Sequence, residues 1–183
     1  MQKIEKLCLD KIPLVQLIDF YSRNEQFFNE LKFIPMNSPI VNDTFRFVKW
    51  LYAEFLPIGY RDFQLDLAVE LKNSCTSCGL QRGLSDQELE ILSIAALLHN
   101  IGCIEGQYHD RTVAKTIAHS FLAEKGLLEW KIEKVEYAIE ATAEESTPKG
   151  QLAALIRQLK FKQAARIAAY KRFQTQQIGD VFP

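Results

Sequence analysis

An almost uninterrupted apolar helix constrains the fold of this chain more than any other feature. From Ile91 to Leu98 the sequence reads ILSIAALL, which is apolar on nearly every face of a helix. Such a helix has no face for solvent, so it lies in the middle of a helical bundle. Just before it, SDQE predicts a capping box, in which Ser85 and Glu88 each accept the backbone N–H of the other. We therefore expect a buried central helix that starts after Ser85, with Gly102 as its C-terminal stop.

The rest of the chain shows helical periodicity almost throughout, and no strand pattern of useful length. The further predicted helices cover residues 45–55, 62–72, 109–126, 129–145 and 148–173. Asp43-Thr44 is the predicted cap of the first of these helices. Thr147 is the predicted N-cap of the last, with Pro148 at its first helical position. The fold class is therefore all-α, with residues 1–42 as a helical extension on a domain formed by residues 43–183.

Composition and charge exclude several classes of protein. The chain has 183 residues, 48% hydrophobic and 25% charged, which is ordinary for a globular domain. A net charge of −1 gives no electrostatic reason to expect nucleic acid or an anionic membrane as a partner. No apolar run approaches the ~20 residues of a membrane-spanning helix, and the first residues do not resemble a signal peptide. We expect a soluble, cytoplasmic protein that binds neither nucleic acid nor a membrane.

The four cysteines are Cys8, Cys75, Cys78 and Cys103. Cys75 and Cys78 form a C-x-x-C motif in the polar stretch NSCTSCGLQRG, which predicts a loop. A structural zinc site needs four ligands, usually from a second pair of similar spacing, and the chain has no second pair. A redox pair of the thioredoxin type belongs to a βαβ unit, which the helical pattern does not provide. We interpret the two cysteines as free loop thiols.

Polar residues gather where the central helix ends. A metal site would favour Asp after His99 because Asp brings negative charge, but the chain has Asn100, which brings none. The simplest interpretation of His99 is a core histidine hydrogen-bonded to a neighbour. Asn100 can bond the backbone at the helix end. Asp110 is favoured at a helix start by capping and the helix dipole alone, and Glu105 can be a solvated loop carboxylate.

These pieces, in this order, resemble the HD superfamily of metal-dependent phosphohydrolases. The likeness covers about residues 60–161 and rests on LLHNIG, on Glu105, on His109-Asp110 followed by VAKTIA, and on AIEATAEESTP. In that family a helix ends in ALLHDIG, a loop carries Glu, and the next helix opens with His-Glu or His-Asp. The resemblance implies an HD-like helical bundle around a central metal site, with nucleotides or other phosphate esters as substrates.

The family binds its metal through a first His, a His-Asp pair and a final Asp. The resemblance places Leu65 at the first His, and His99 with Asn100 at the pair. The final Asp falls at Gln158 or Lys160, depending on the register. Because carboxylates supply much of the affinity for a divalent cation, we expect no catalytic residue, metal or cofactor at the family position. The candidate ligands of any metal that does bind are His99, His109 and Asp110.

A cation of the protein itself is a possible substitute for the metal. Lys160, Arg157 or Arg61, which stands at an earlier family His, would keep a positive centre in the vacated space. Such a centre can hold a phosphate or another anion. The vestigial ligand-binding pocket would be lined by His99, Asn100, Glu105, His109, Asp110 and Lys160.

Two functions remain open at this point. The first is a degenerate, catalytically inactive HD-like domain that serves as a regulatory, ligand-sensing or protein-interaction module, as signalling members of the superfamily do. Its partner would be a nucleotide, a phosphorylated small molecule or another protein. The second is an active metal-dependent phosphohydrolase with a rearranged site, in which His99, Glu105, His109 and Asp110 hold a divalent metal such as Mn, Fe, Ni or Mg. The second function requires a bound metal and at least two carboxylates that converge on it.

Overall fold

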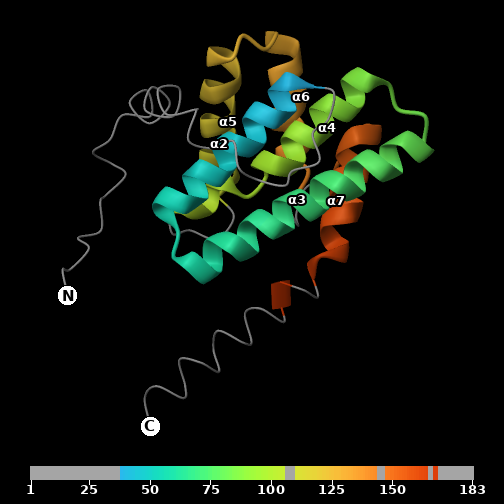
Figure 1. Ribbon diagram of the computed structural model, residues 1–183. Coiled ribbons are helices and arrows are strands. Elements are labelled where there is room, and N and C mark those ends of the chain that lie inside the picture. The colour runs from blue at the N-terminus through green and yellow to red at the C-terminus, as the bar shows by residue number, and fades with distance from the viewer. Residues whose placement is uncertain (1–37, 106–109, 144–146, 165–166, 169–183) are drawn as a thin grey trace, which may run out of the picture.

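The computed structural model of the chain describes residues 38–105, 110–143, 147–164 and 167–168. Within these ranges the protein is all-α, as predicted, and no residue belongs to a strand. The elements are α2 (Pro39–Phe55), α3 (Ile58–Gln81), α4 (Asp86–Leu98), the 3-10 helix η3 (Ile101–Glu105), α5 (Arg111–Glu124), α6 (Glu129–Glu140) and α7 (Gln151–Lys162). Figure 1 shows these helices gathered in one bundle, and α4 packs against α2, α3, α6 and α7.

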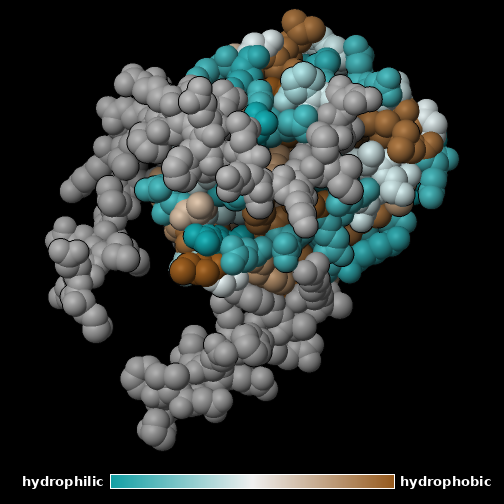
Figure 2. All heavy atoms as spheres, in the orientation of Figure 1, coloured by the Kyte–Doolittle hydropathy of each residue, from teal (hydrophilic) through white to brown (hydrophobic). Residues whose placement is uncertain are grey.

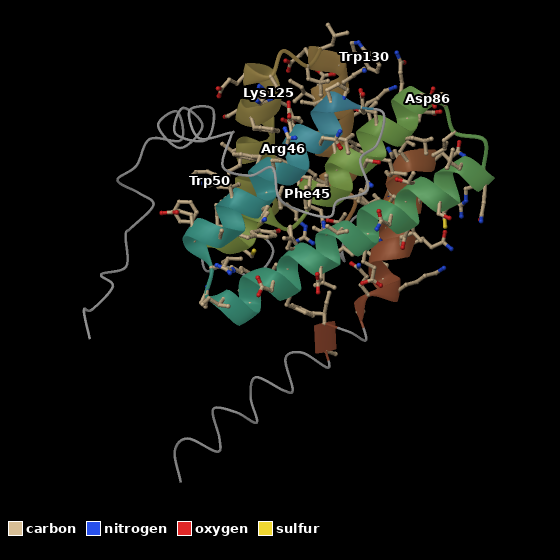
Figure 3. The ribbon with its side chains drawn as sticks, in the orientation of Figure 1. Phe45, Arg46, Trp50, Asp86, Lys125 and Trp130 are labelled. Carbon is tan, nitrogen blue, oxygen red and sulfur yellow. The ribbon has the colours of Figure 1, made fainter. Side chains whose placement is uncertain are left out.

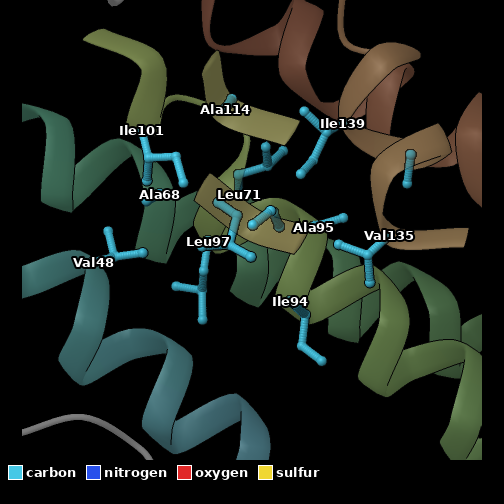
Figure 4. Close-up of a cluster of buried hydrophobic side chains, with 14 of the residues drawn as sticks. Val48, Ala68, Leu71, Ile94, Ala95, Leu97, Ile101, Ala114, Val135 and Ile139 are labelled. Atoms are coloured by element: carbon cyan, nitrogen blue, oxygen red, sulfur yellow. The ribbon is translucent and has the colours of Figure 1, made fainter. Parts of the chain in front are cut away.

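Helix α4 is the central helix that the apolar run predicts. Every side chain from Ile91 to Leu98 is buried. Side chains from the neighbouring helices surround it, among them Val48 of α2, Leu71 of α3 and Val135 of α6 (Figure 4). Burying one such Leu, Ile or Val stabilises the folded state by about 1.5–3 kcal/mol. The core of the bundle is therefore built around α4.

The predicted capping box at the start of α4 is confirmed. The Ser85 hydroxyl oxygen accepts the Glu88 backbone N–H at 3.4 Å. Oε2 of Glu88 accepts the Ser85 backbone N–H at 2.9 Å and the Ser85 hydroxyl at 2.7 Å. These hydrogen bonds stabilise the carboxylate and hold the pKa of Glu88 below its usual value.

Helix α2 starts earlier than predicted. The capping role expected of Asp43-Thr44 is wrong, because the helix begins at Pro39 after Ser38. Proline fits the first turn of a helix, where its missing N–H would have no intrahelical partner. Val41 already lies in the core, so a boundary between residues 42 and 43 would cut this helix. The predicted end of the helix before Pro57 is confirmed.

The aromatic residues of α2 pack into the core. Phe47 stacks on Phe121 of α5, with ring centroids 4.1 Å apart. Trp50 meets Phe55 edge to face at 6.3 Å. Figure 3 labels Phe45 and Trp50 along the helix, together with Arg46, which pairs with Asp43 at 3.6 Å. The buried aromatics of α2 are Phe45, Phe47, Trp50 and Tyr52, whereas Phe55 is half-buried.

Helix α3 is longer at both ends than the predicted 62–72, and it includes the C-x-x-C motif. The loop prediction for Cys75 and Cys78 is therefore wrong. Cys75 is buried and Cys78 is half-buried. The reason is that Leu71, Cys75 and Gly79 continue one buried stripe at four-residue steps, while the polar residues Asn73 and Ser77 between them are exposed. Gly79 lets α4 approach closely, since a Cβ there would lie 2.6 Å from Cδ2 of Leu89.

Gly102 has a different role from the one predicted. Helix α4 ends at Leu98, and Gly102 lies inside η3 without the positive φ of a glycine helix stop. A Cβ on Gly102 would overlap the backbone carbonyl oxygen of Asp110. The glycine therefore allows the backbone before α5 to pass directly against η3.

The observed end of α5 agrees with the prediction, whereas the observed start of α7 differs from it. Helix α5 ends at Glu124, and Gly126 follows with φ +73°, as expected of a glycine after a helix. Helix α7 begins at Gln151, so the predicted cap at Thr147 with Pro148 is wrong. Gly150 precedes α7 at φ +94° and provides no side-chain cap.

The face shown in Figure 2 is mostly hydrophilic over the described residues, with hydrophobic side chains in small groups. None of the described helices combines the length and the hydropathy needed to span a membrane.

Candidate functional site

The polar end of α4 meets α3 through two amide side chains. Nδ2 of Asn100 donates to Oε1 of Gln64 at 3.0 Å. Both residues are only 3% exposed. The expected partner of Asn100 was the backbone at the helix end, and the partner found is a side chain 36 positions earlier. This hydrogen bond pairs two buried polar atoms without bringing a charge into the core.

Gln64 is the α3 residue that reaches this site, and the sequence analysis missed it. The resemblance pointed to the next position, Leu65, which is half-buried and packs against the hydrophobic core. Gln64 lies on the buried stripe of α3, four residues before Ala68 and seven before Leu71. That spacing was the available signal, because Gln64, Ala68 and Leu71 all lie within the predicted helix 62–72.

His99 is oriented by the backbone of α4. It is 1% exposed, and its Nδ1 lies 2.8 Å from the carbonyl oxygen of Ala96. Because a carbonyl oxygen only accepts, Nδ1 carries the proton and donates. This is the geometry expected of a core histidine. The same bond orients many metal-binding histidines, with Nε2 left to face the metal, so the ring orientation alone is compatible with both roles.

Asp110 is the N-cap of α5, as predicted. Its Oδ1 accepts the backbone N–H groups of Thr112 at 2.8 Å and Val113 at 3.2 Å. A carboxylate at this position also interacts favourably with the helix dipole. His109 and the side chain of Glu105, the other two acid or imidazole groups predicted for the pocket, lie outside the described residues.

The start of α5 also contacts the end of α6. Nη2 of Arg111 donates to the carbonyl oxygen of Thr142 at 3.1 Å. Thr142 is 3% exposed, and its hydroxyl donates to the carbonyl oxygen of Ile139 at 2.7 Å. The sequence analysis did not single out Arg111, because one arginine in the first turn of a helix carries no distinctive pattern.

The two candidate positions on α7, Gln158 and Lys160, differ in burial. Gln158 is exposed and accepts a hydrogen bond from Arg82 at 3.1 Å, so it faces away from the core. Lys160 is half-buried, and its Nζ is shielded from solvent. Of the two candidate positions, the more buried one is the cation Lys160.

One turn beyond Lys160, α7 is bonded to α3. Gln163 is 5% exposed, and its Nε2 donates to the carbonyl oxygen of Leu67 at 3.0 Å. Leu67 lies one turn after Gln64 on α3. This contact packs the end of α7 against the part of α3 that faces Asn100.

The other two cations considered for the pocket have partners elsewhere. Nε of Arg61 pairs with Oδ1 of Asp62 at 3.1 Å, and both side chains are substantially exposed. The Arg157 guanidinium lies 5.4 Å from the ring centroid of Phe161, which is itself exposed. The charged nitrogen of Lys160 is shielded from solvent.

One hydrogen bond joins two of the candidate groups, the amides of Gln64 and Asn100. The His99 imidazole precedes Asn100 in the chain, the Lys160 ammonium lies on α7, and the Asp110 carboxylate caps α5. Amide, imidazole and ammonium groups donate hydrogen bonds, and the ammonium adds positive charge, which suits an anionic oxygen. Over the ranges that the structure describes, no group of three or more His, Cys, Asp or Glu side chains is placed to hold a metal ion.

Comparison of the chain with protein-family models, curated proteins and solved structures finds no match.

Proposed function

We propose that this chain is a catalytically inactive HD-like domain that serves as a regulatory, ligand-sensing or protein-interaction module. The hydrogen bond between Gln64 and Asn100 is the observation that carries the proposal. At the position where the resemblance requires the Asp of the metal-binding pair, a neutral amide is held by another neutral amide. This buried pair of neutral amides brings no negative charge to the position, and negative charge supplies much of the affinity for a divalent cation.

Electrostatics support the same proposal. A divalent cation at Oδ1 of Asn100 would gain an uncharged oxygen, where the Asp of the family supplies a charged one. Lys160 adds an ammonium group on α7, whose last turn packs against the α3 segment that carries Gln64. Positive charge in a poorly solvated region opposes the binding of a second positive charge.

Metal content tests the inactive state directly. The protein is incubated separately with Mn, Fe, Ni, Zn and Mg, passed through gel filtration, and examined by elemental analysis. We expect no retained metal while circular dichroism shows an intact helical fold. Stoichiometric metal that is lost in His99→Ala would contradict the proposal and favour the phosphohydrolase. Metal that is lost only in Cys78→Ser would place the metal at the C-x-x-C motif.

The ligand class that fits the site best is a phosphate-bearing small molecule, such as a nucleotide. The shielded ammonium of Lys160 supports this class. A ligand present at a hundred times its Kd stabilises the folded state by about 2.7 kcal/mol, which a thermal-shift assay detects. We expect nucleotides or inorganic phosphate to raise Tm in the wild type and in Arg157→Gln, but not in Lys160→Gln. No shift with any phosphate compound would leave protein interaction as the role to pursue.

A further inference from the structure

Two thiols on α3 form a chemical site of their own, several turns along the helix from Gln64. Cys75 and Cys78 are three residues apart, so α3 brings their side chains to the same side of the helix. Cys75 is fully buried in the core, and Cys78 is half-buried against it. A small reagent in solution therefore meets Cys78 first, with Cys75 behind it.

The surroundings of Cys75 keep it protonated. Burial raises the pKa of its thiol to about 12, and the nearby Cys78 contributes in the same direction. A protonated thiol is a poor nucleophile, so Cys75 does not react with an oxidant on its own. Cys103 is also buried, and burial raises its pKa to about 12 as well, but the sequence has no cysteine within a turn of it. Cys103 is therefore a matched control within the same chain.

We propose that Cys75 and Cys78 are a peroxide-sensitive dithiol whose oxidation to a disulfide distorts the last turns of α3. The Cys78 thiolate attacks hydrogen peroxide, the O–O bond breaks, and hydroxide leaves, which gives a sulfenic acid. The Cys75 sulfur then attacks the Cys78 sulfur and the S–O bond breaks. The departing hydroxide takes the Cys75 proton and becomes water. Overall, two thiols lose two hydrogens, and one peroxide molecule becomes two molecules of water.

Helix geometry makes this disulfide incompatible with an unchanged α3. Residues three apart on a helix have Cβ atoms about 5–6 Å apart, whereas a disulfide needs about 3.5–4.5 Å. Closing the bond must therefore draw Cys78 toward Cys75 by roughly 1–2 Å. The helix ends soon after, at Gln81, and Gly83 follows with φ +72°. The distortion falls on the last turns, which have the fewest helical hydrogen bonds beyond them.

The same turns hold α3 against α4, so the distortion reaches the central helix. The hydroxyl oxygens of Thr76 and Ser93 lie 3.3 Å apart. Gly79 packs so closely on Leu89 that a Cβ there would lie 2.6 Å from Cδ2 of Leu89. Moving Cys78 displaces both contacts, because it lies between Thr76 and Gly79 in the chain. Oxidation thus couples the state of two thiols to the packing of α4.

One tryptic peptide reports the chemistry. Cleavage after Lys72 and Arg82 releases NSCTSCGLQR, which contains both thiols and no other cysteine. The full-length protein is treated with hydrogen peroxide, denatured, alkylated and digested. We expect this peptide to lose the mass of two hydrogen atoms and to escape alkylation, reversibly with dithiothreitol, while Cys103 is still alkylated. In Cys75→Ala the reaction stops at a Cys78 sulfenic acid that dimedone traps, and in Cys78→Ser the peptide stays reduced.

Thermal unfolding tests the second part of the proposal, which is that the disulfide distorts the last turns of α3. The oxidised wild-type protein is expected to show a Tm several degrees below that of the reduced protein, with no such change in peroxide-treated Cys78→Ser. The proposal of a peroxide-sensitive dithiol would be overturned if Cys103 were oxidised at the same peroxide dose as the pair. It would also be overturned if Cys78 were converted directly to a sulfinic acid. A disulfide that forms without any change in Tm or helicity would overturn the coupling to α4.

Discussion

Helix α4 begins at the surface and ends in the core, and its two ends are held by contacts of different range. At the first end, Ser85 and Glu88 bond one another across three positions, partly in contact with water. At the other end, Asn100 bonds Gln64 across 36 positions, and both are buried. The first set of bonds fixes where one helix starts. The second fixes how α3 and α4 pack, so its loss affects two elements at once.

The backbone contact at Gly102 lies near the buried end of α4 and likewise joins two different elements. η3 and the residue that caps α5 touch there through main-chain atoms, without room for a side chain. Main-chain atoms cannot rotate away as a side chain can, so any added atom has to move a whole segment. The buried end of α4 should therefore be much more sensitive to substitution than the exposed end.

Gly102→Ala should have the largest effect. The new Cβ overlaps the carbonyl oxygen of Asp110, so η3 and the start of α5 have to separate. We expect a loss of about 3 kcal/mol in the free energy of unfolding, at the upper end of the usual cost of overpacking. Urea unfolding followed by circular dichroism measures it.

Gly59→Ala is the control for Gly102→Ala. Gly59 lies in α3, has ordinary helical φ, and has no atom within 4 Å of an added Cβ. Alanine favours the helix over glycine by up to about 1 kcal/mol, so this variant should be as stable as the wild type or slightly more stable. Equal destabilisation by the two variants would mean that the contact with Asp110 does not limit packing.

The same difference in range explains what the sequence could predict. The apolar run of α4, its capping box and the cap at Asp110 depend on residues within a few positions, and these predictions are confirmed. The length of α3 was underestimated because polar residues around Cys75 and Cys78 suggested a loop, although Leu71, Cys75 and Gly79 continued the buried stripe. In this segment the periodicity of the buried residues is a better guide to the helix than its polar composition.

The candidate site was harder to predict than the fold because its contacts join distant segments. The sequence offered Leu65 for the α3 position, but a shift of one residue turns a helix by about 100°, and Gln64 faces Asn100 instead. On α7 the sequence left Gln158 and Lys160 open, and only the packing of α7 on α3 shows which one is more buried. To know which residues of two helices face each other, one needs the angle and position at which the helices cross. A single sequence does not contain this information.

The amide pair should show the next largest effect. Gln64→Leu and Asn100→Leu each leave the remaining amide buried without its partner, so each should cost about 2 kcal/mol. The double variant replaces both by apolar groups, so it should cost clearly less than the sum of the two. Urea unfolding of the four proteins gives the coupling, which we expect to be about 1 kcal/mol.

Arg82 and Gln158 provide the control pair for this double-mutant cycle. They are bonded at 3.1 Å between the C-cap residue of α3 and α7, but at an exposed position. Water can replace an exposed hydrogen bond, so the coupling in an Arg82→Ala and Gln158→Ala cycle should stay below about 0.5 kcal/mol. If the Gln64–Asn100 coupling is no larger than this, the buried amides do not fix the packing of α3 on α4.

Substitutions at the exposed end of α4 should have the smallest effect on the free energy of unfolding. Of the effects predicted for the two ends of α4, this one depends on pH. Ser85→Ala should cost about 1 kcal/mol through the lost cap. The hydrogen bonds from Ser85 lower the pKa of Glu88 in the folded state, so the stability that its carboxylate adds is present above the unfolded-state value of about 4.3 and is lost as pH falls through the folded value. Wild type and Glu88→Gln should therefore differ in free energy of unfolding at pH 7 and converge in acid. A difference that persists at pH 2 would mean that Glu88 acts through packing rather than charge, in which case this end of the helix would resemble the buried one.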